Sequence, residues 1–219
     1  MQHAHNRARI FGQPKPRRVA SAFFCVVILA VAAVSGYAQI EDEEFIEPEY
    51  QLGDQYFTIR VGGFAPLFFH NPLEGEVNST NLRLGGSGAL SWQGYLNNRW
   101  SIGGELAGVF TNSVNRRTLF MVPITAKLSY LFSSWPFEFP IHIAAGGAFQ
   151  SLEGDTYFGP IAKPGVGAWW NATGEWAFGV QAEYWWVPQF YRGADNRPPG
   201  TDTRFGNFLD VTLGARYSF

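Results

Sequence analysis

Cysteine is nearly absent from this chain of 219 residues, because Cys25 is the only one. One thiol excludes an internal disulfide and a cysteine-built metal centre. Cys25 lies in the apolar segment 22–34, AFFCVVILAVAAV, and follows Phe24, whereas the cysteine of a lipoprotein leader follows a small residue. We therefore expect a fold that needs no disulfide, even on an oxidising, exported route.

Acidic residues are missing from the first 21 positions, where Arg7, Arg9, Lys15, Arg17 and Arg18 are the charged residues. The apolar segment and the stretch SGYA before Gln39 follow them. This order is typical of a secretory signal peptide. The apolar segment is shorter than the roughly 20 residues that cross a bilayer as a helix. We predict a cleaved signal peptide over residues 1–38, with an uncleaved anchor as the alternative.

No apolar run beyond residue 38 approaches the length of a membrane-spanning helix. Without its first 38 residues the chain has 16 − 5 = 11 Lys and Arg against 18 Asp and Glu, a net charge of −7. Six of these acids fall in residues 41–49, EDEEFIEPE. We predict an acidic, solvated periplasmic segment over residues 39–54, and a nucleic-acid partner is disfavoured.

Aromatic residues (17%) and glycine (25 residues) are abundant, and the rest of the chain alternates between apolar and polar positions. Such alternation predicts strands with two unlike faces. Eight stretches show it: 55–67, 82–96, 100–111, 118–132, 139–151, 159–170, 175–187 and 207–219. Short turn-like connections (NNR, SSWPFE, NATG) alternate with longer polar ones. This pattern predicts an all-β protein, an eight-stranded antiparallel up-and-down transmembrane β-barrel over residues 55–219, with both ends of the chain in the periplasm.

Charged residues avoid the apolar face of every stretch. In the first stretch Phe57, Ile59 and Val61 share one face, and Arg60 lies on the other. A soluble sandwich gives the same parity, but Trp and Tyr near both ends of the apolar face favour the aromatic girdles of a membrane barrel. The parity predicts a lumen-lining network of Arg60, Arg83, Glu105, Lys127, His142, Lys163, Glu183, Asp210 and Arg216.

Two interpretations of this network remain open. An eight-stranded barrel has an interior that side chains can fill, so paired charges would form a plug. The alternative is a narrow or gated path for a small solute.

Four prolines lie toward the rim where the long loops begin: Pro66, Pro123, Pro160 and Pro164. Proline donates no ladder hydrogen bond, so it weakens strand pairing. They mark either the ends of strands or a lateral opening through the wall for a lipid-like or hydrophobic molecule.

The chain ends in FLDVTLGARYSF, with apolar residues at every second position: Val211, Leu213, Ala215, Tyr217 and Phe219. This ending resembles the C-terminal assembly signal of bacterial outer-membrane barrels. Residues 55–219 resemble the OmpW-like group of small eight-stranded barrels, and ITAKLSYLFSSWPFEFPIHIAAGGAF is similar to barrel paralogues of treponemes. The resemblance implies outer-membrane lipid, the barrel assembly machinery and periplasmic chaperones as partners. It also implies a channel for small hydrophobic solutes with a lateral exit.

No motif of an enzyme is present. His70, Ser79 and Asp155 lie in separate loops, without a nucleophile motif or a metal-binding motif. We predict no enzymatic activity and no cofactor. Passive movement of small molecules, porin-like, is the favoured function. A surface-exposed adhesin that binds a host surface or matrix ligand through its long loops is one alternative, and a purely structural, plugged barrel is another.

Overall fold

The computed structural model describes residues 49–114, 117–152, 155–190 and 203–219. The predicted signal peptide and most of the predicted acidic segment lie outside these residues. The described residues contain no helix that is long and apolar enough to cross a membrane.

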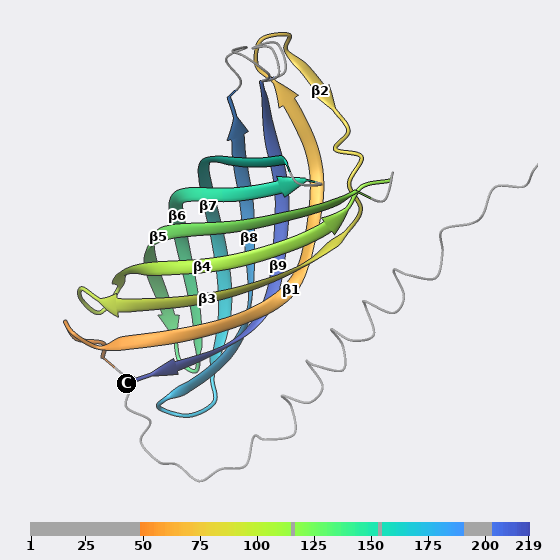
Figure 1. Ribbon diagram of the computed structural model, residues 1–219. Coiled ribbons are helices and arrows are strands. Elements are labelled where there is room, and N and C mark those ends of the chain that lie inside the picture. The colour runs from red at the N-terminus through yellow and green to blue at the C-terminus, as the bar shows by residue number, and fades with distance from the viewer. Residues whose placement is uncertain (1–48, 115–116, 153–154, 191–202) are drawn as a thin grey trace, which may run out of the picture. The chain divides into compact units, whose positions relative to one another are not determined.

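Within the described residues, nine strands form one sheet, in the order β2-β1-β3-β4-β5-β6-β7-β8-β9. They are β1 (Gln55–Asn71), β2 (Glu76–Asn78), β3 (Gly85–Tyr95), β4 (Trp100–Asn112), β5 (Thr118–Ser134), β6 (Phe137–Leu152), β7 (Asp155–Asn171), β8 (Trp176–Gln189) and β9 (Arg204–Ser218). Every neighbouring pair is antiparallel, and β1 also pairs with β9 from Tyr56↔Ser218 to His70↔Phe205. This last pairing closes an eight-stranded barrel, to which β2 adds a short hairpin on β1 (Figure 1). The predicted fold is confirmed.

The two ends of the barrel differ in their connections. At one end, here called the short-turn end, residues 96–99, 135–136 and 172–175 join the strands. At the other, the loop end, residues 72–84 and 190–203 make long connections. The sequence predicted a long connection after residue 151 as well, but β6 and β7 extend and pair as far as Leu152↔Asp155. Longer strands have replaced that loop.

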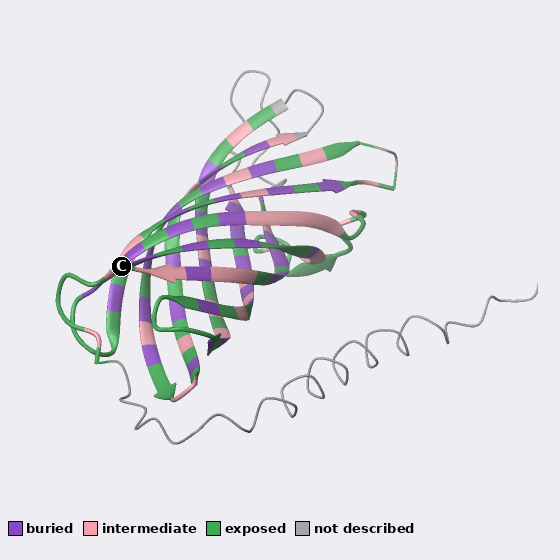
Figure 2. Ribbon diagram, turned by 90° about the horizontal axis from the view of Figure 1, so that it is seen from below, coloured by how far each residue is buried: buried purple, intermediate pink, exposed green. Residues whose placement is uncertain are grey.

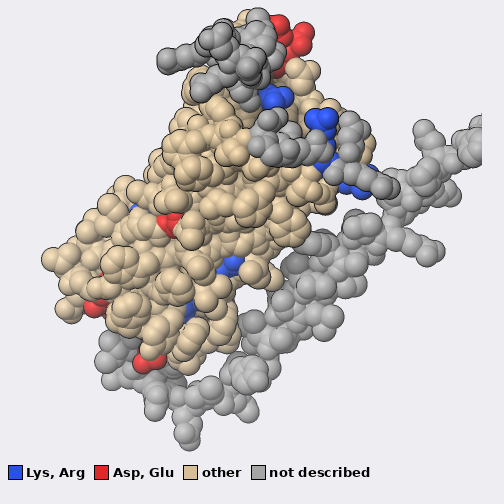
Figure 3. All heavy atoms as spheres, in the orientation of Figure 1, with Lys and Arg blue, Asp and Glu red and all other residues tan. Residues whose placement is uncertain are grey.

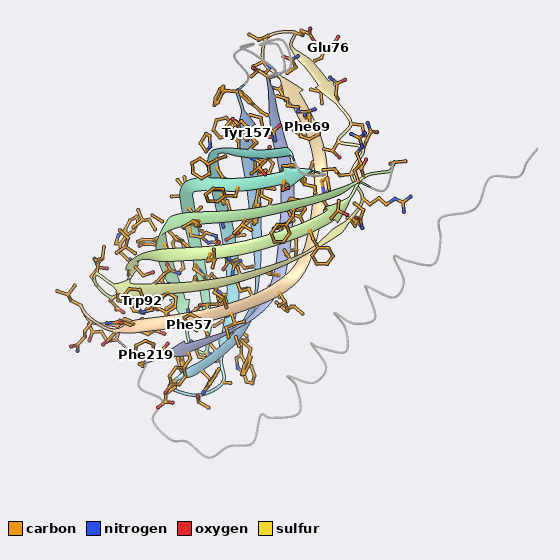
Figure 4. The ribbon with its side chains drawn as sticks, viewed as in Figure 1. Phe57, Phe69, Glu76, Trp92, Tyr157 and Phe219 are labelled. Atoms are coloured by element: carbon orange, nitrogen blue, oxygen red, sulfur yellow. The ribbon has the colours of Figure 1, made fainter. Side chains whose placement is uncertain are left out.

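The strand faces follow the predicted parity. Phe57, Ile59 and Val61 are exposed on the outside of β1, whereas Tyr56, Thr58 and Arg60 are buried inside. Figure 2 shows buried and exposed positions alternating along the strands. The outer surface between the two ends shows few charged atoms in Figure 3. Aromatic side chains lie near both ends of this surface, with Phe57, Trp92 and Phe219 toward the short-turn end in Figure 4. A lipid-facing band with aromatic girdles has this composition.

Strand pairing is not continuous at the loop end. The β7–β8 ladder stops at Ala162↔Trp186, although β7 starts at Asp155 and β8 runs on to Gln189. The β1–β3 ladder stops at Phe64↔Gly85, although β1 continues to Asn71. Toward the loop end the sheet therefore divides into a β8–β9–β1–β2 part and a β3–β7 part (Figure 1).

Candidate functional site

The interior of the barrel is the candidate site, and it has three layers. Tyrosines fill the short-turn end, a group of ion pairs fills the middle, and apolar side chains fill the loop end. Each layer consists of inward positions contributed by most of the strands, because successive inward residues of a strand lie at successive depths.

The middle layer, here called the ion-pair cluster, consists of Arg60, Glu105, Lys127, Lys163 and Glu183. The guanidinium of Arg60 donates to Glu105 Oε2 at 2.6 Å and to Glu183 Oε1 at 3.2 Å. Lys127 Nζ lies 3.2 Å from Glu105 Oε2 and 3.6 Å from Glu183 Oε1. Lys163 Nζ pairs with Glu105 and lies 3.6 Å from Glu183 Oε2. Each carboxylate therefore contacts all three cations.

These five charges must be paired because they are buried. All five side chains are at most 3% exposed. A charge that leaves water is tolerated only where opposite charges and hydrogen bonds replace its hydration. Neighbouring side chains add such bonds, because Trp185 Nε1 and Gln181 Nε2 donate to Glu183 at 3.2 and 2.5 Å. The layer thus crosses the barrel as one bonded network.

The layer at the short-turn end is built around Arg216. Its guanidinium pairs with Glu138 and donates to Asn171 Oδ1 at 3.2 Å. Tyr50, from the segment before β1, donates its hydroxyl to Glu138 Oε1 at 2.5 Å and stacks on Tyr95 with ring centroids 4.1 Å apart. Burial raises the pKa of the Tyr50 phenol above its usual value, so the hydroxyl remains a donor at neutral pH. Tyr50 therefore covers this end of the lumen.

The layer at the loop end, here called the loop-end cluster, is apolar. It consists of Phe64, Ala89, Ala107, Val109, Met121, Ala148, Ile161, Trp185, Val187 and Phe208, with Phe69 and Leu82 packed against it. Phe64 is central, with its ring centroid 4.9 Å from that of Phe208 and 5.3 Å from that of Trp185. Trp185 also connects the layers, because Lys163 Nζ lies 4.8 Å from the centroid of its ring. The loop-end cluster and the ion-pair cluster are therefore in contact through this residue.

Eight of the nine predicted lumen residues are buried inside the barrel, and one is exposed. Arg60, Glu105, Lys127, His142, Lys163, Glu183, Asp210 and Arg216 are buried inside the barrel. The prediction for Arg83 is wrong: it is exposed, because β3 begins only at Gly85. His142 Nε2 lies 3.0 Å from Glu183 Oε1 and so extends the ion-pair cluster. Asp210 is buried on β9, but its Oδ1 has no hydrogen-bond partner.

The four predicted prolines lie at irregular places in the wall. Pro66 adjoins a register shift between β1 and β9. Pro123 lies in a gap of the β4–β5 ladder, between Leu106↔Ile124 and Val109↔Met121. Pro164 lies in a gap of the β7–β8 ladder, and Pro160 belongs to the part of β7 that has no β8 partner. The missing N–H of proline accounts for the two gaps.

Sequence reasoning missed Glu138 and the aromatic lumen residues. The segment SSWPFE was assigned to a turn, but the turn is only Trp135–Pro136, which places Glu138 inside β6. Trp185 was not assigned a role, although its parity with Glu183 marks it as inward. Tyr50 precedes the first strand, so no alternation pointed to it.

Two of the residues considered for catalysis, His70 of β1 and Ser79 of the connection after β2, have separate contacts. His70 packs 6.2 Å from the ring of Phe205, and Ser79 Oγ accepts a hydrogen bond from the Asn81 N–H. Across the described ranges no group of three or more His, Cys, Asp or Glu is arranged to hold a metal ion.

Comparison with known proteins agrees with this geometry. One protein-family profile matches residues 37–217. A protein of Treponema pallidum is 24% identical over 182 residues, which cover 73% of this chain and 62% of that protein. A protein of Borreliella burgdorferi is 29% identical over 168 residues, covering 66% of this chain and 74% of that protein. The chain thus spans less than two thirds of the treponemal relative.

A solved structure shares the fold. The crystal structure of Neisserial surface protein A is similar with a TM-score of 0.57 and 12% identity, over 79% of this chain and 100% of that one. At this identity the likeness concerns the fold alone. The family profile, the treponemal and Borreliella relatives and the closed eight-stranded barrel lead to one conclusion: the chain belongs to the small eight-stranded outer-membrane β-barrel proteins, the general level at which the OmpW-like resemblance holds.

Proposed function

We propose that this barrel lets small, largely apolar molecules diffuse passively between its loop-end mouth and the surrounding lipid. One observation carries the proposal: the β7–β8 ladder ends at Ala162↔Trp186, directly beside the apolar loop-end cluster. An apolar molecule that enters the mouth meets apolar side chains and then a wall without ladder hydrogen bonds. Burial of apolar surface favours its entry, and the OmpW-like resemblance implies the same kind of route.

The divergent part of the wall, here called the seam, is bounded by residues 155–161 of β7 and 187–190. Ile161 lines its inner side and is 3% exposed, whereas Phe158 faces outward and is 60% exposed. Hydrogen bonds made by side chains and loop backbone bridge it near the mouth. Among them, Phe190 N–H donates to Tyr157 Oη at 3.0 Å, and Gln189 Nε2 donates to Oε1 of Gln150, on β6, at 2.5 Å. Side-chain bonds of this kind are worth about 1 kcal/mol each, so the seam opens more readily than a complete ladder.

A straight path through the barrel has less support. The ion-pair cluster crosses the lumen below the loop-end cluster, and its charges are held by short contacts. A permeating ion would have to break several buried pairs, each costly to leave unpaired. The proposed route therefore turns sideways above this layer.

A cross-link across the seam tests the route. Gln150→Cys with Gln189→Cys places two thiols on either side, in a chain whose only native cysteine is Cys25. The protein is expressed in a Gram-negative host, and uptake of an apolar fluorescent dye by intact cells is measured before and after treatment with a short bifunctional thiol reagent. We expect uptake to fall to the level of cells without the protein, and to recover when a cleavable reagent is reduced.

The matched control is Val166→Cys with Ala182→Cys, because these positions already pair between β7 and β8, the strands that bound the seam, at a level below it. A cross-link there should leave dye uptake unchanged. Unchanged uptake after complete cross-linking of positions 150 and 189 would contradict the lateral route and leave the structural, plugged barrel as the better interpretation.

One feature favours surface binding as a second candidate. The β1–β2 hairpin projects at the loop end, where Figure 4 labels Glu76. It exposes Leu73 and Val77, each to 65%. Apolar side chains on a projecting hairpin provide a contact surface for a host or matrix ligand. Replacing residues 72–79 by a short turn should abolish cell adhesion if this candidate is correct, without changing the effect of the seam cross-link.

A further inference from the structure

A small polar cavity lies between the ion-pair cluster and the tyrosines of the short-turn end. Its volume is about 20 Å³. Its lining includes Thr58, Ser91, Gln93, Lys127, His142 and Arg216. Although the cavity adjoins two ion-paired layers, none of its described lining residues is a carboxylate. The cavity thus presents hydrogen-bond donors and positive charge.

The size restricts what the cavity can hold. A water molecule needs roughly 10–15 Å³ on this measure, so about 20 Å³ accommodates one or two waters or one monatomic ion. Phosphate, sulfate and organic anions are too large. The polar lining excludes an apolar occupant, because its donors would be left without partners.

One buried donor of the lining, Arg216 Nε, is free to serve an occupant. Gln93 Oε1 accepts hydrogen bonds from the hydroxyls of Ser129 at 2.9 Å and Ser101 at 3.4 Å. These two hydrogen bonds orient the Gln93 amide beside the cavity. Arg216 Nε is buried and has no hydrogen-bond partner among the described residues. A buried N–H group without an acceptor is costly, and an anion would satisfy it.

The ion-pair cluster, which adjoins the cavity, has the positive charge that would attract an anion. The ion-pair cluster contains three cations and two carboxylates within contact distance, an excess of one positive charge. Asp210 is the register partner of Glu183 across the β8–β9 ladder, but it makes no ion pair with the described residues, and its Oδ1 accepts no hydrogen bond. It therefore neutralises no cation of the cluster by direct contact. Lys127 belongs both to the cluster and to the cavity lining. The excess charge is therefore adjacent to the cavity.

We propose that this cavity is a binding site for one monovalent, halide-sized anion. The bound ion accepts hydrogen bonds from donors of the lining, including the free Arg216 Nε, and balances the excess charge of the ion-pair cluster through Lys127. Its role is to complete the polar packing between the ion-pair cluster and the layer at the short-turn end. The site is separate from the seam, so the proposal does not depend on the route of transport.

Bromide is the probe, because its anomalous scattering distinguishes it from water. Crystals of the wild-type protein grown in bromide are expected to show an anomalous peak inside the cavity. The melting temperature should also rise saturably with bromide at constant ionic strength, with gluconate as the replaced anion, because a ligand that binds only the folded state stabilises it. Ordered water in the cavity, with bromide only at surface positions, would overturn the proposal.

Two variants and a control sharpen this test. Lys127→Met removes the excess charge, so both the peak and the saturable shift should disappear, whereas Arg99→Met removes an exposed cation and should keep both. If Lys127→Met does not fold, Thr58→Val replaces a lining hydroxyl with a methyl group and leaves every ion pair in place. It should weaken bromide binding about five-fold, the effect of one lost hydrogen bond. Unchanged bromide affinity in Thr58→Val would contradict the proposed lining.

Discussion

The two halves of the lumen are filled by different kinds of side chain. The half toward the short turns contains charged and polar side chains held by specific ion pairs, inside a wall closed by β1 and β9. The half toward the loops contains apolar side chains, and there the wall divides between β7 and β8. Charges need fixed partners, whereas apolar contacts are non-directional. The polar half is therefore built to stay closed, and the apolar half can rearrange.

The largest expected effect comes from breaking the polar half. Glu105→Gln leaves Arg60, Lys127 and Lys163 with one carboxylate among them. Removing one partner of a buried ion pair costs about 3–5 kcal/mol, so the free energy of unfolding in urea, measured in lipid vesicles, should fall by about this amount. Ion conductance should appear at the same time, because the network that crosses the lumen is broken.

Glu175→Gln is the control for this variant, since Glu175 is exposed in a short turn. It should change stability by less than about 0.5 kcal/mol. If Glu105→Gln were as stable as the control and still sealed, the ion-pair cluster would not be the element that closes the barrel.

The apolar half should respond differently to the loss of its largest side chain. Trp185→Ala removes a side chain that is 1% exposed and contacts Phe64. Truncating a buried tryptophan costs about 3–5 kcal/mol. The variant also removes the hydrogen bond from Trp185 Nε1 to Glu183, but every charge keeps its ion-pair partners. Dye uptake should increase, while ion conductance stays absent. Conductance equal to that of Glu105→Gln would show that the two halves are not independent.

The sequence correctly predicted which strand residues of β1 face the lumen and which face outward, because side chains alternate along a strand with a period of two. The apolar face of β1 thus identified Arg60 as a lumen residue. It did not predict that Lys163 of β7 reaches Glu105 of β4, because such contacts cross the lumen and depend on the stagger of the whole barrel. Arg83 was misplaced for a local reason: it precedes the regular part of β3, which begins at Gly85, so the alternation of the strand no longer determines its face. Pro160 and Pro164 indicated weak pairing, but only the register shows which ladder stops.

A smaller effect is expected where two strands approach closely. A Cβ added to Gly103 would lie 1.9 Å from the carbonyl oxygen of Trp92, whereas at Gly104 the nearest atom is 4.0 Å away. Gly103→Ala should therefore lower the free energy of unfolding by about 1–3 kcal/mol, as overpacking does, and Gly104→Ala should change it far less. Urea unfolding of the two variants side by side measures the difference. Equal losses would mean that a shift of the wall relieves the tight approach of β3 and β4. The wall of the polar half could then rearrange as well.

The smallest expected effect concerns the cover of the polar half. Tyr50→Ala removes the ring stacked on Tyr95 and the hydroxyl bonded to Glu138. We expect a loss of about 1 kcal/mol for the aromatic pair, because Tyr50 precedes the barrel wall and takes no part in the ladder. Amide exchange at buried lumen positions near the short turns, such as Tyr95 and Ser101, should accelerate, while that at Val109 in the loop-end cluster should not. Tyr50→Phe keeps the stack and loses only the hydrogen bond, so it should fall between the wild type and Tyr50→Ala. Equal acceleration at both ends would mean that Tyr50 stabilises the whole barrel and does not act as a local cover of the polar half.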